Sequence, residues 1–165
     1  MKRLLSLIIS LFRKNKRNST SYTAKCKHVF DGDSFSALKD GDTEPFEIRL
    51  YGIDAPERGQ EYAKQSREEL IKLIRNKSIR VEVMDTDRYG RTVAKVFRNG
   101  LYINLELLKR GLAWFYSYHA GADDELRQAQ EYARAHKNGL WQSDTPISPR
   151  KRRKSNPSTR HKGVK

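Results

Sequence analysis

Hydrophobic and polar residues alternate with a period of two in five segments of the chain, which is the pattern of half-buried β-strands. The turn-forming pairs Asp31-Gly32 and Asn99-Gly100 and the polar cluster 39–42 lie between or after these segments. The first three strands are predicted to follow one another in series, and the last two are predicted to form a hairpin. The predicted strands are 22–30, 34–38, 46–51, 78–84 and 92–97.

Three other segments have the period of a helix. Residues 62–76 place their apolar side chains on one face and most of their charges elsewhere, as an amphipathic helix does. A short helix is predicted over 104–110, capped by Asn104 and ended by Gly111, and a last helix is predicted over 122–136. Short strands with helices between them predict a β-barrel with helices, here an OB-fold: a five-stranded barrel plus three α-helices.

The positive charge of the protein is concentrated at its two ends. The chain has 165 residues and a formal net charge of +14. The first 20 residues hold six Lys/Arg, residues 145–165 hold eight, and neither segment has an acid, so the part between them is formally neutral. This distribution predicts a basic and apolar N-terminal segment (1–21), one folded domain (22–144) and a basic disordered tail (145–165).

The two ends allow more than one interpretation. The tail run 150–154 either holds a polyanion without reading its sequence or only keeps the protein soluble. The N-terminus has two bases followed by the apolar run 4–12, so it could be a signal peptide, a membrane-surface anchor or a basic arm. This run is shorter than a bilayer span. The sequence favours a secreted or membrane-associated location over a cytoplasmic one.

Cysteine and histidine give no metal or disulfide chemistry. Cys26 is the only cysteine, so an internal disulfide and a cysteine-rich zinc site are excluded. The four histidines lack the spacing of metal ligands. Any metal in this protein is therefore expected to bind to oxygen atoms.

Three clusters of charged residues lie at turns beside predicted strands: 31–34, 49–57 and 87–91. The first cluster alone is weak evidence for a functional site, because Asp-Gly-Asp turns occur in many hairpins. The second places Arg49 inside an apolar strand and the carboxylates of Asp54 and Glu57 on either side of a proline. A structural salt bridge between Arg49 and one of these acids is the alternative to a functional role.

These residue types suit the hydrolysis of a phosphodiester. Asp33 and Asp54 can supply carboxylate ligands to a hard divalent cation, and Pro56 restricts Ala55 so that its carbonyl can point at the same ion. Catalysis also requires that the phosphoryl oxygens be neutralised and that a water be deprotonated. Arg49 and Arg91 are the candidate phosphate-binding residues. Glu57 is the candidate general base.

Four ordered motifs at compatible spacing resemble those of the staphylococcal nuclease family over about residues 22–143. The family pattern of Asp-Gly-Asp-Thr, then Arg with Asp-Thr-Pro-Glu, then Asp-Lys-Tyr-Gly-Arg, then Gly-Leu-Ala matches this chain. Three residues of the matching segments differ from the family pattern: Ser34 and Ala55 each stand where the family has threonine, and Arg88 stands where it has lysine. The matching segments are 31–34, Arg49 with 54–57, 87–91 and 111–113.

The resemblance implies an OB-fold barrel with three helices and one calcium ion per site. It implies an endonuclease that cleaves DNA and RNA, in single-stranded or open regions, to products with 3'-phosphates, and that acts as a monomer without an obligate protein partner. By the same resemblance, Asp33, Asp54 and the Ala55 carbonyl are the calcium ligands. Glu57 is the base, and Arg49 and Arg91 bind phosphate.

Four further residues are substrate-binding candidates by resemblance. Arg88 stands where the family has a lysine near the terminal phosphate of the substrate, so the charge is kept but the geometry differs. Tyr89 could stack on a base or pack on its own strand. Tyr116 and Tyr118 match two pocket tyrosines only if a one-residue difference in spacing is allowed, and packing in the core or at its rim is the alternative.

A non-catalytic nucleic-acid-binding OB-fold module is the main alternative function. Such a module has little use for a cluster of acids beside a polyanion, because like charges repel unless a cation lies between them. All five residues of the proposed catalytic set are present, which favours the enzyme. A third class, a protein whose basic arms bind anionic lipid, would explain the ends but not the charged turns.

Overall fold

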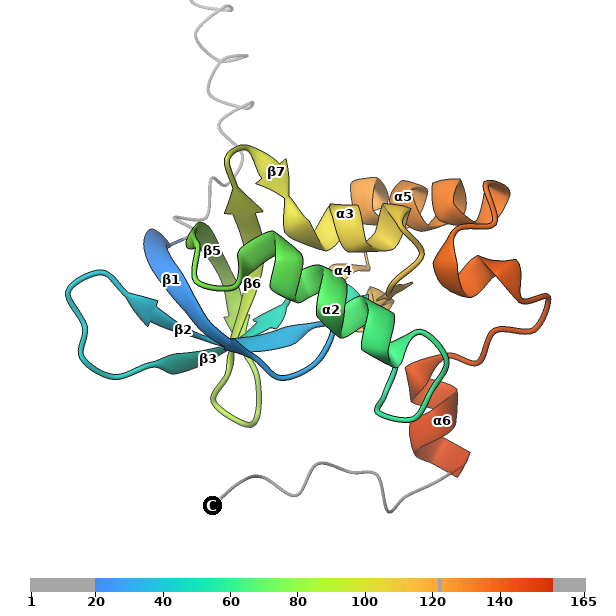
Figure 1. The fold of residues 1–165 in the computed structure, drawn as a ribbon, viewed down its shortest axis with the longest axis horizontal. Coiled ribbons are helices and arrows are strands. Elements are labelled where there is room, and N and C mark those ends of the chain that lie inside the picture. The colour runs from blue at the N-terminus through green and yellow to red at the C-terminus, as the bar shows by residue number, and fades with distance from the viewer. Residues whose placement is uncertain (1–19, 122, 156–165) are drawn as a thin grey trace, which may run out of the picture.

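The computed structural model describes residues 20–121 and 123–155, and these form one β-barrel with helices on one side (Figure 1). The predicted N-terminal segment lies outside the described residues up to position 19, and so does the tail from position 156. None of the helices in the described part is long and apolar enough to cross a membrane.

Five strands build the barrel. They are β1 (Ser21–Val29), β2 (Ser34–Lys39), β3 (Phe46–Leu50), β5 (Ser78–Thr86) and β6 (Thr92–Arg98). Their order in the sheet is β3-β2-β1-β5-β6, with antiparallel neighbours, and a parallel pairing of β3 with β6 closes the sheet on itself. The prediction of a five-stranded OB-like barrel is confirmed.

Three two-residue strands were not predicted from the sequence. They are β4 (Ile53–Asp54), β7 (Leu101–Tyr102) and β8 (Trp114–Phe115). β7 extends the sheet beyond β6, whereas β4 and β8 pair with each other in a separate ladder. Asp54 lies opposite Trp114 in that ladder, so its position depends on a segment 60 residues later in the chain.

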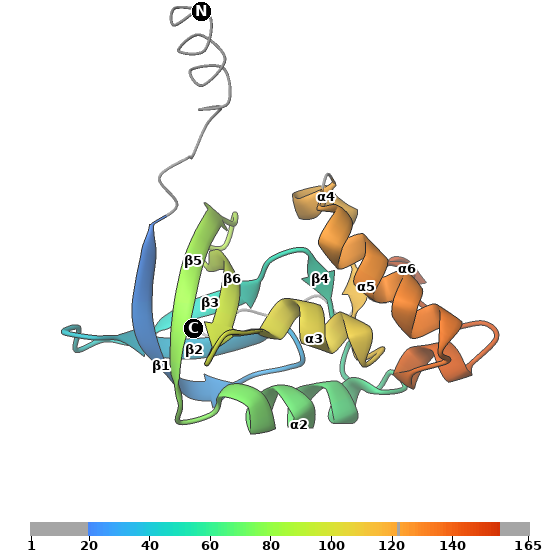
Figure 2. The ribbon, with the colours of Figure 1, turned by 90° about the horizontal axis from the view of Figure 1, so that it is seen from above.

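The three predicted helices correspond to α2 (Ala63–Ile74), α3 (Ile103–Lys109) and α5 (Asp124–Ala135). The described residues also contain α4 (Ser117–Ala120), the 3-10 helix η1 (Gly139–Gln142) and α6 (Pro149–Ser155). Seen from above, α2, α3 and α5 lie beside the barrel at the end where β4 is found (Figure 2). Disorder was predicted for 145–165, but residues 149–155 form α6, which Pro149 can start because proline suits the first position of a helix.

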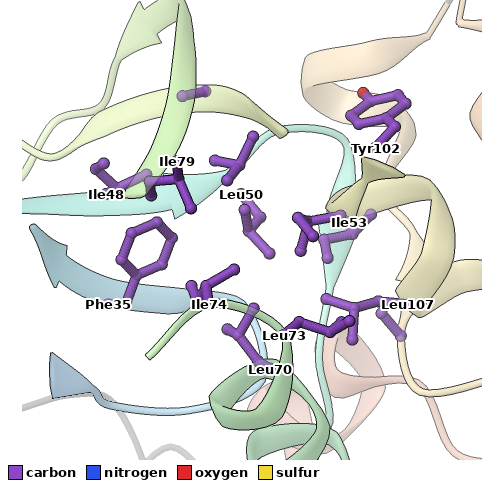
Figure 3. Packing of buried hydrophobic residues seen from close by; sticks show 14 of the residues in the cluster. Phe35, Ile48, Leu50, Ile53, Leu70, Leu73, Ile74, Ile79, Tyr102 and Leu107 are labelled. Atoms are coloured by element: carbon purple, nitrogen blue, oxygen red, sulfur yellow. The ribbon is translucent and has the colours of Figure 1, made fainter. Parts of the chain in front are cut away.

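The core lies inside the barrel and under α2. Leu70, Leu73 and Ile74 of α2 pack with Phe35 and Ile79 of the barrel (Figure 3). Leu70, Ile74 and Phe35 are completely buried. Burial of such side chains stabilises the fold by about 1.5–3 kcal/mol each. The turns at the barrel edge are thereby held on a rigid support.

Asn104 does not cap α3, so this prediction is wrong. Tyr102 is the residue before the helix, and no side chain caps it. Asn104 lies inside the first turn, where its Oδ1 accepts from the N–H of Val96 and its Nδ2 donates to the carbonyls of Tyr51 and Ala94. The side chain is fully buried and links β6 to the chain after β3. Its bonds satisfy backbone groups that would be costly to bury unpaired.

Candidate active site

The turn between β1 and β2 carries the first acid of the site. The carboxylate of Asp31 accepts from the N–H of Asp33 at 3.0 Å and from the hydroxyl of Ser34 at 2.7 Å. Gly32 lies tightly against α2, since a Cβ there would be 1.9 Å from Oγ of Ser66. This turn therefore requires glycine for a packing reason, and it places Asp33 in a buried position.

Arg49 links this turn to the next acid. It lies opposite Ser34 in the pairing of β2 with β3, so its guanidinium reaches Asp33, the residue before Ser34. Its Nη1 donates to Oδ1 of Asp33, and its Nη2 donates to Oδ1 of Asp54 at 3.0 Å and to the carbonyl of Ile53 at 3.2 Å. The structural salt bridge that the sequence allowed is thus present, and it involves both aspartates.

The two aspartates lie in a strongly desolvated place. Each exposes only 4% of its surface. Burial raises the pKa of Asp33 more than Arg49 lowers it, and the carboxylates of Asp31 and Asp54 raise it further, to about 8. Both oxygens of Asp33 nevertheless accept from N–H donors, as in an ionised carboxylate. A further cation beside Asp33, in addition to Arg49, would lower this pKa.

The segment after β4 carries the remaining acid. Ala55 donates its N–H to Oδ2 of Asp33 at 2.6 Å, which ties β4 to the β1–β2 turn. The N–H of Glu57 donates to Oε1 of Gln60 at 2.7 Å and fixes the loop that leads into α2. The side chain of Glu57 is 18% exposed. The structure therefore brings Asp33, Asp54 and Glu57 together at the rim of the barrel.

Arg153 of α6 also enters this cluster, a contact that the sequence did not predict. Its Nη2 donates to Oδ2 of Asp54 at 2.8 Å, and its Nη1 donates to Oε1 of Glu57 at 2.5 Å. Burial lowers the pKa of Arg153, but the two carboxylates raise it more, so it stays fully charged. Figure 1 shows α6 next to the loop that leads into α2. The only signal in the sequence was a run of bases, which is also typical of a solvated tail.

The chain matches the model of the family described as staphylococcal nuclease homologue over residues 47–143, which is more than half of its length. This range contains Arg49, Asp54, Glu57 and Arg91. The chain belongs to the staphylococcal nuclease family. The expected membership is therefore confirmed, and the fold described above agrees with it.

Three relatives illustrate this membership of the staphylococcal nuclease family. An uncharacterized endonuclease of Haemophilus influenzae is 38% identical over 77% of this chain and 70% of its own length. Protein ParB of Escherichia coli is 32% identical over 82% of this chain and 81% of its own length. Staphylococcal-like nuclease CAN1 of Arabidopsis thaliana is 41% identical over 67% of this chain but only 34% of its own length. The chain thus spans about a third of this plant relative.

The second arginine that the family pattern contains, Arg91, lies beside the strand of Arg49. It precedes Thr92, which pairs with Ile48 across the parallel β3–β6 contact. Its Nε donates to Oδ2 of Asp87 at 2.8 Å, and the same carboxylate accepts from two backbone N–H groups of the 87–91 turn. Burial raises the pKa of Asp87, but the hydrogen bonds from Arg91 and the backbone lower it by more. Asp87 therefore orients the arginine.

The same turn presents Arg88 and Tyr89 to solvent. Tyr89 is 67% exposed, and Nη2 of Arg88 donates to its hydroxyl at 2.7 Å. The guanidinium groups of Arg88 and Arg91 lie 4.8 and 5.5 Å from the centre of its ring. An exposed ring between two cations can stack on a base next to a phosphate. Tyr89 is therefore not packed into the barrel edge.

The structure brings Tyr116 and Tyr118 close to Asp54. With Asp54 they line a pocket of about 130 Å³ that α6 also borders. Their rings lie 6.0 Å apart at an angle of 39°, and Tyr118 is 81% exposed. Core packing is therefore excluded for Tyr118. Both tyrosines remain substrate-binding candidates, and their place beside Asp54 fits that role.

The oxygen donors of the cluster fit a calcium ion. Within residues 20–121 and 123–155, no group of three or more His, Cys, Asp and Glu side chains is arranged to hold a metal. The expected set needs only two carboxylates, from Asp33 and Asp54, completed by the Ala55 carbonyl and water. Both carboxylates are buried, and both already attract a guanidinium. The chemistry of the site therefore suits a hard cation.

Proposed function

We propose that the chain is a calcium-dependent endonuclease that hydrolyses phosphodiester bonds of DNA and RNA and leaves 3'-phosphate products. The observation that carries this proposal is the buried pair Asp33 and Asp54, joined by Arg49, with Glu57 joined to Asp54 through Arg153. A buried acid cluster is costly unless it binds cations or performs proton chemistry. Membership in the staphylococcal nuclease family and relatives named as nucleases support the same conclusion.

Asp33, Asp54 and the carbonyl of Ala55 would hold the calcium. When bound, the ion supplies positive charge that offsets the repulsion between these acids and the phosphodiester and stabilises charge on the phosphoryl oxygens. Asp33 and Asp54 are fixed by strand pairing, by Arg49 and by the N–H of Ala55. The site is therefore largely preorganised for a cation.

We assign the role of general base to Glu57. In the proposed step the carboxylate of Glu57 takes a proton from a water, the water oxygen bonds to phosphorus, and the bond from phosphorus to the 5' oxygen breaks. The departing 5' oxygen takes a proton from solvent water, so the products carry a 3'-phosphate and a 5'-hydroxyl. The loop that holds Glu57 is fixed through Gln60. Arg49 and Arg91 would neutralise the phosphoryl oxygens as negative charge builds up. Asp87 holds Arg91 in position for that task.

Single-stranded or open regions are the proposed substrates, and the protein would act as a monomer. The exposed ring of Tyr89 and the Tyr116–Tyr118 pair lie on surfaces where unpaired bases could stack. A base that stacks on one of these tyrosine rings must first leave its pair in a duplex. Paired regions are therefore expected to react more slowly than open ones.

Analysis of the product ends tests this proposal. Single-stranded DNA and RNA are digested with the protein and calcium, and the fragments are offered to a polynucleotide kinase with labelled ATP. We expect the fragments to accept phosphate without prior dephosphorylation, because their 5' ends carry hydroxyls. Fragments that need dephosphorylation first would contradict the proposed direction of bond breakage, although the protein would still be a nuclease.

A further inference from the structure

Helix α6 (Pro149–Ser155) has no part in the function proposed above. It carries five consecutive bases, at positions 150–154, and no acid. Of these bases, Arg153 is the one whose guanidinium contacts the acid cluster. The proposed reaction needs a cation and a substrate at that cluster, so the place occupied by Arg153 requires an explanation.

The chain before α6 is fastened to the same loop that carries the proposed base. Nε2 of Gln60 donates to the carbonyl of Ile147 at 3.1 Å, while Oε1 of the same side chain accepts from the N–H of Glu57. Pro149 is buried and, with Arg150, borders the pocket beside Asp54. The helix is therefore held at its start as well as through Arg153, and it covers the pocket from one side.

We propose that α6 is an intramolecular inhibitor whose Arg153 occupies the acid cluster until calcium and nucleic acid displace it. The proposal rests on the proposed function, because it assigns Asp54 to the ion and Glu57 to the water. Arg153 donates to both oxygens of Asp54 and to Oε1 of Glu57, in charge-assisted hydrogen bonds. While Oε1 of Glu57 accepts from Arg153, that oxygen is not free to accept a hydrogen bond from a water. An ion that approaches Asp54 must also overcome the repulsion of a fixed positive charge.

Substrate can remove the inhibitor. A polyanion that binds along the barrel attracts the five bases of α6 and competes with the carboxylates for Arg153, and each phosphate contact releases counterions. A long strand offers many phosphates, whereas an oligonucleotide of a few residues offers few. Inhibition by α6 is therefore expected to be strong for short substrates at low calcium and weak for long substrates at high calcium.

The test compares the full-length protein with Arg153→Ala and with the control Lys154→Ala. Lys154 is exposed and lies in the same helix, so its substitution removes an equal charge from α6. Calcium binding is measured by calorimetry in the absence of nucleic acid. Cleavage of a short single-stranded oligonucleotide is then measured over a range of calcium concentrations. We expect Arg153→Ala to bind calcium about tenfold more tightly than wild type, and Lys154→Ala to resemble wild type.

The cleavage assay is expected to show the same shift in calcium requirement as the binding assay. Arg153→Ala is expected to reach half of its maximal rate at about tenfold less calcium, with an unchanged maximal rate. A maximal rate that falls in Arg153→Ala would overturn the proposal and make Arg153 a participant in the reaction. Calcium-dependent cleavage with the same calcium requirement in all three proteins would overturn the proposal while the proposed function stands. No calcium uptake by any of the three would overturn both.

Discussion

Substitution Glu57→Gln is expected to lower kcat on single-stranded DNA by about 10²–10⁴-fold, with a much smaller change in KM. Glutamine keeps the size of the side chain but cannot take a proton from water. The measurement is made at saturating calcium and substrate, where displacement of Arg153 does not limit the rate. A loss confined to kcat is the signature of a group that acts in the transition state.

Glu61→Gln is the matched control for this substitution. Glu61 lies in the same loop and is exposed. Its replacement by glutamine changes charge and shape in the same way as Glu57→Gln but leaves the acid cluster intact. We expect its kcat to remain within about twofold of wild type. If Glu57→Gln kept more than a tenth of the wild-type kcat, the proton would have another acceptor and the role of Glu57 would have to be withdrawn.

Substitution Arg49→Ala is expected to lower the free energy of unfolding by about 3–5 kcal/mol and kcat/KM by about 10²–10³-fold. The stability falls because Asp33 and Asp54 are buried and would lose the guanidinium that both of them contact. The activity falls because a donor to the phosphoryl oxygens is lost. Urea denaturation without calcium measures the first effect, and steady-state kinetics measure the second.

Calcium and a surface arginine provide the controls for Arg49→Ala. Calcium is expected to restore part of the lost stability, because a cation at the two carboxylates replaces the missing charge. Arg75→Ala removes an exposed arginine at the end of α2 and is expected to change the free energy of unfolding by less than about 0.5 kcal/mol. A similarly small change in Arg49→Ala would show that the buried ion pairs do not stabilise the fold.

The barrel and most of the site could be predicted from the sequence because the signals are local. Alternation of apolar residues gave the five barrel strands, and the motifs at their ends gave the acids and arginines. The register of β2 against β3 places Arg49 beside Asp33, the residue before its partner Ser34. Glycine is required at position 32 for more than the turn, because a side chain there would clash with Ser66 of α2. That clash could not be predicted from the local sequence.

The features that were missed depend on contacts between distant parts of the chain. The pairing of Asp54 with Trp114 involves only two residues on each strand, too few for a detectable alternation. Asn104 has the residue type of a helix cap but is used inside the first turn, because backbone groups of β6 and Tyr51 need partners. The composition of α6 is that of a disordered tail, and only the acids that it meets, almost 100 residues earlier, give Arg153 its position.

The most direct test of the central claim is the release of acid-soluble nucleotides from single-stranded DNA by the full-length protein, with calcium and with a chelator. The account predicts release that requires calcium and stops when the chelator is added. Absence of release with every divalent metal, by a protein that still binds the DNA, would contradict it. The acid cluster would then belong to a nucleic-acid-binding module instead of an enzyme.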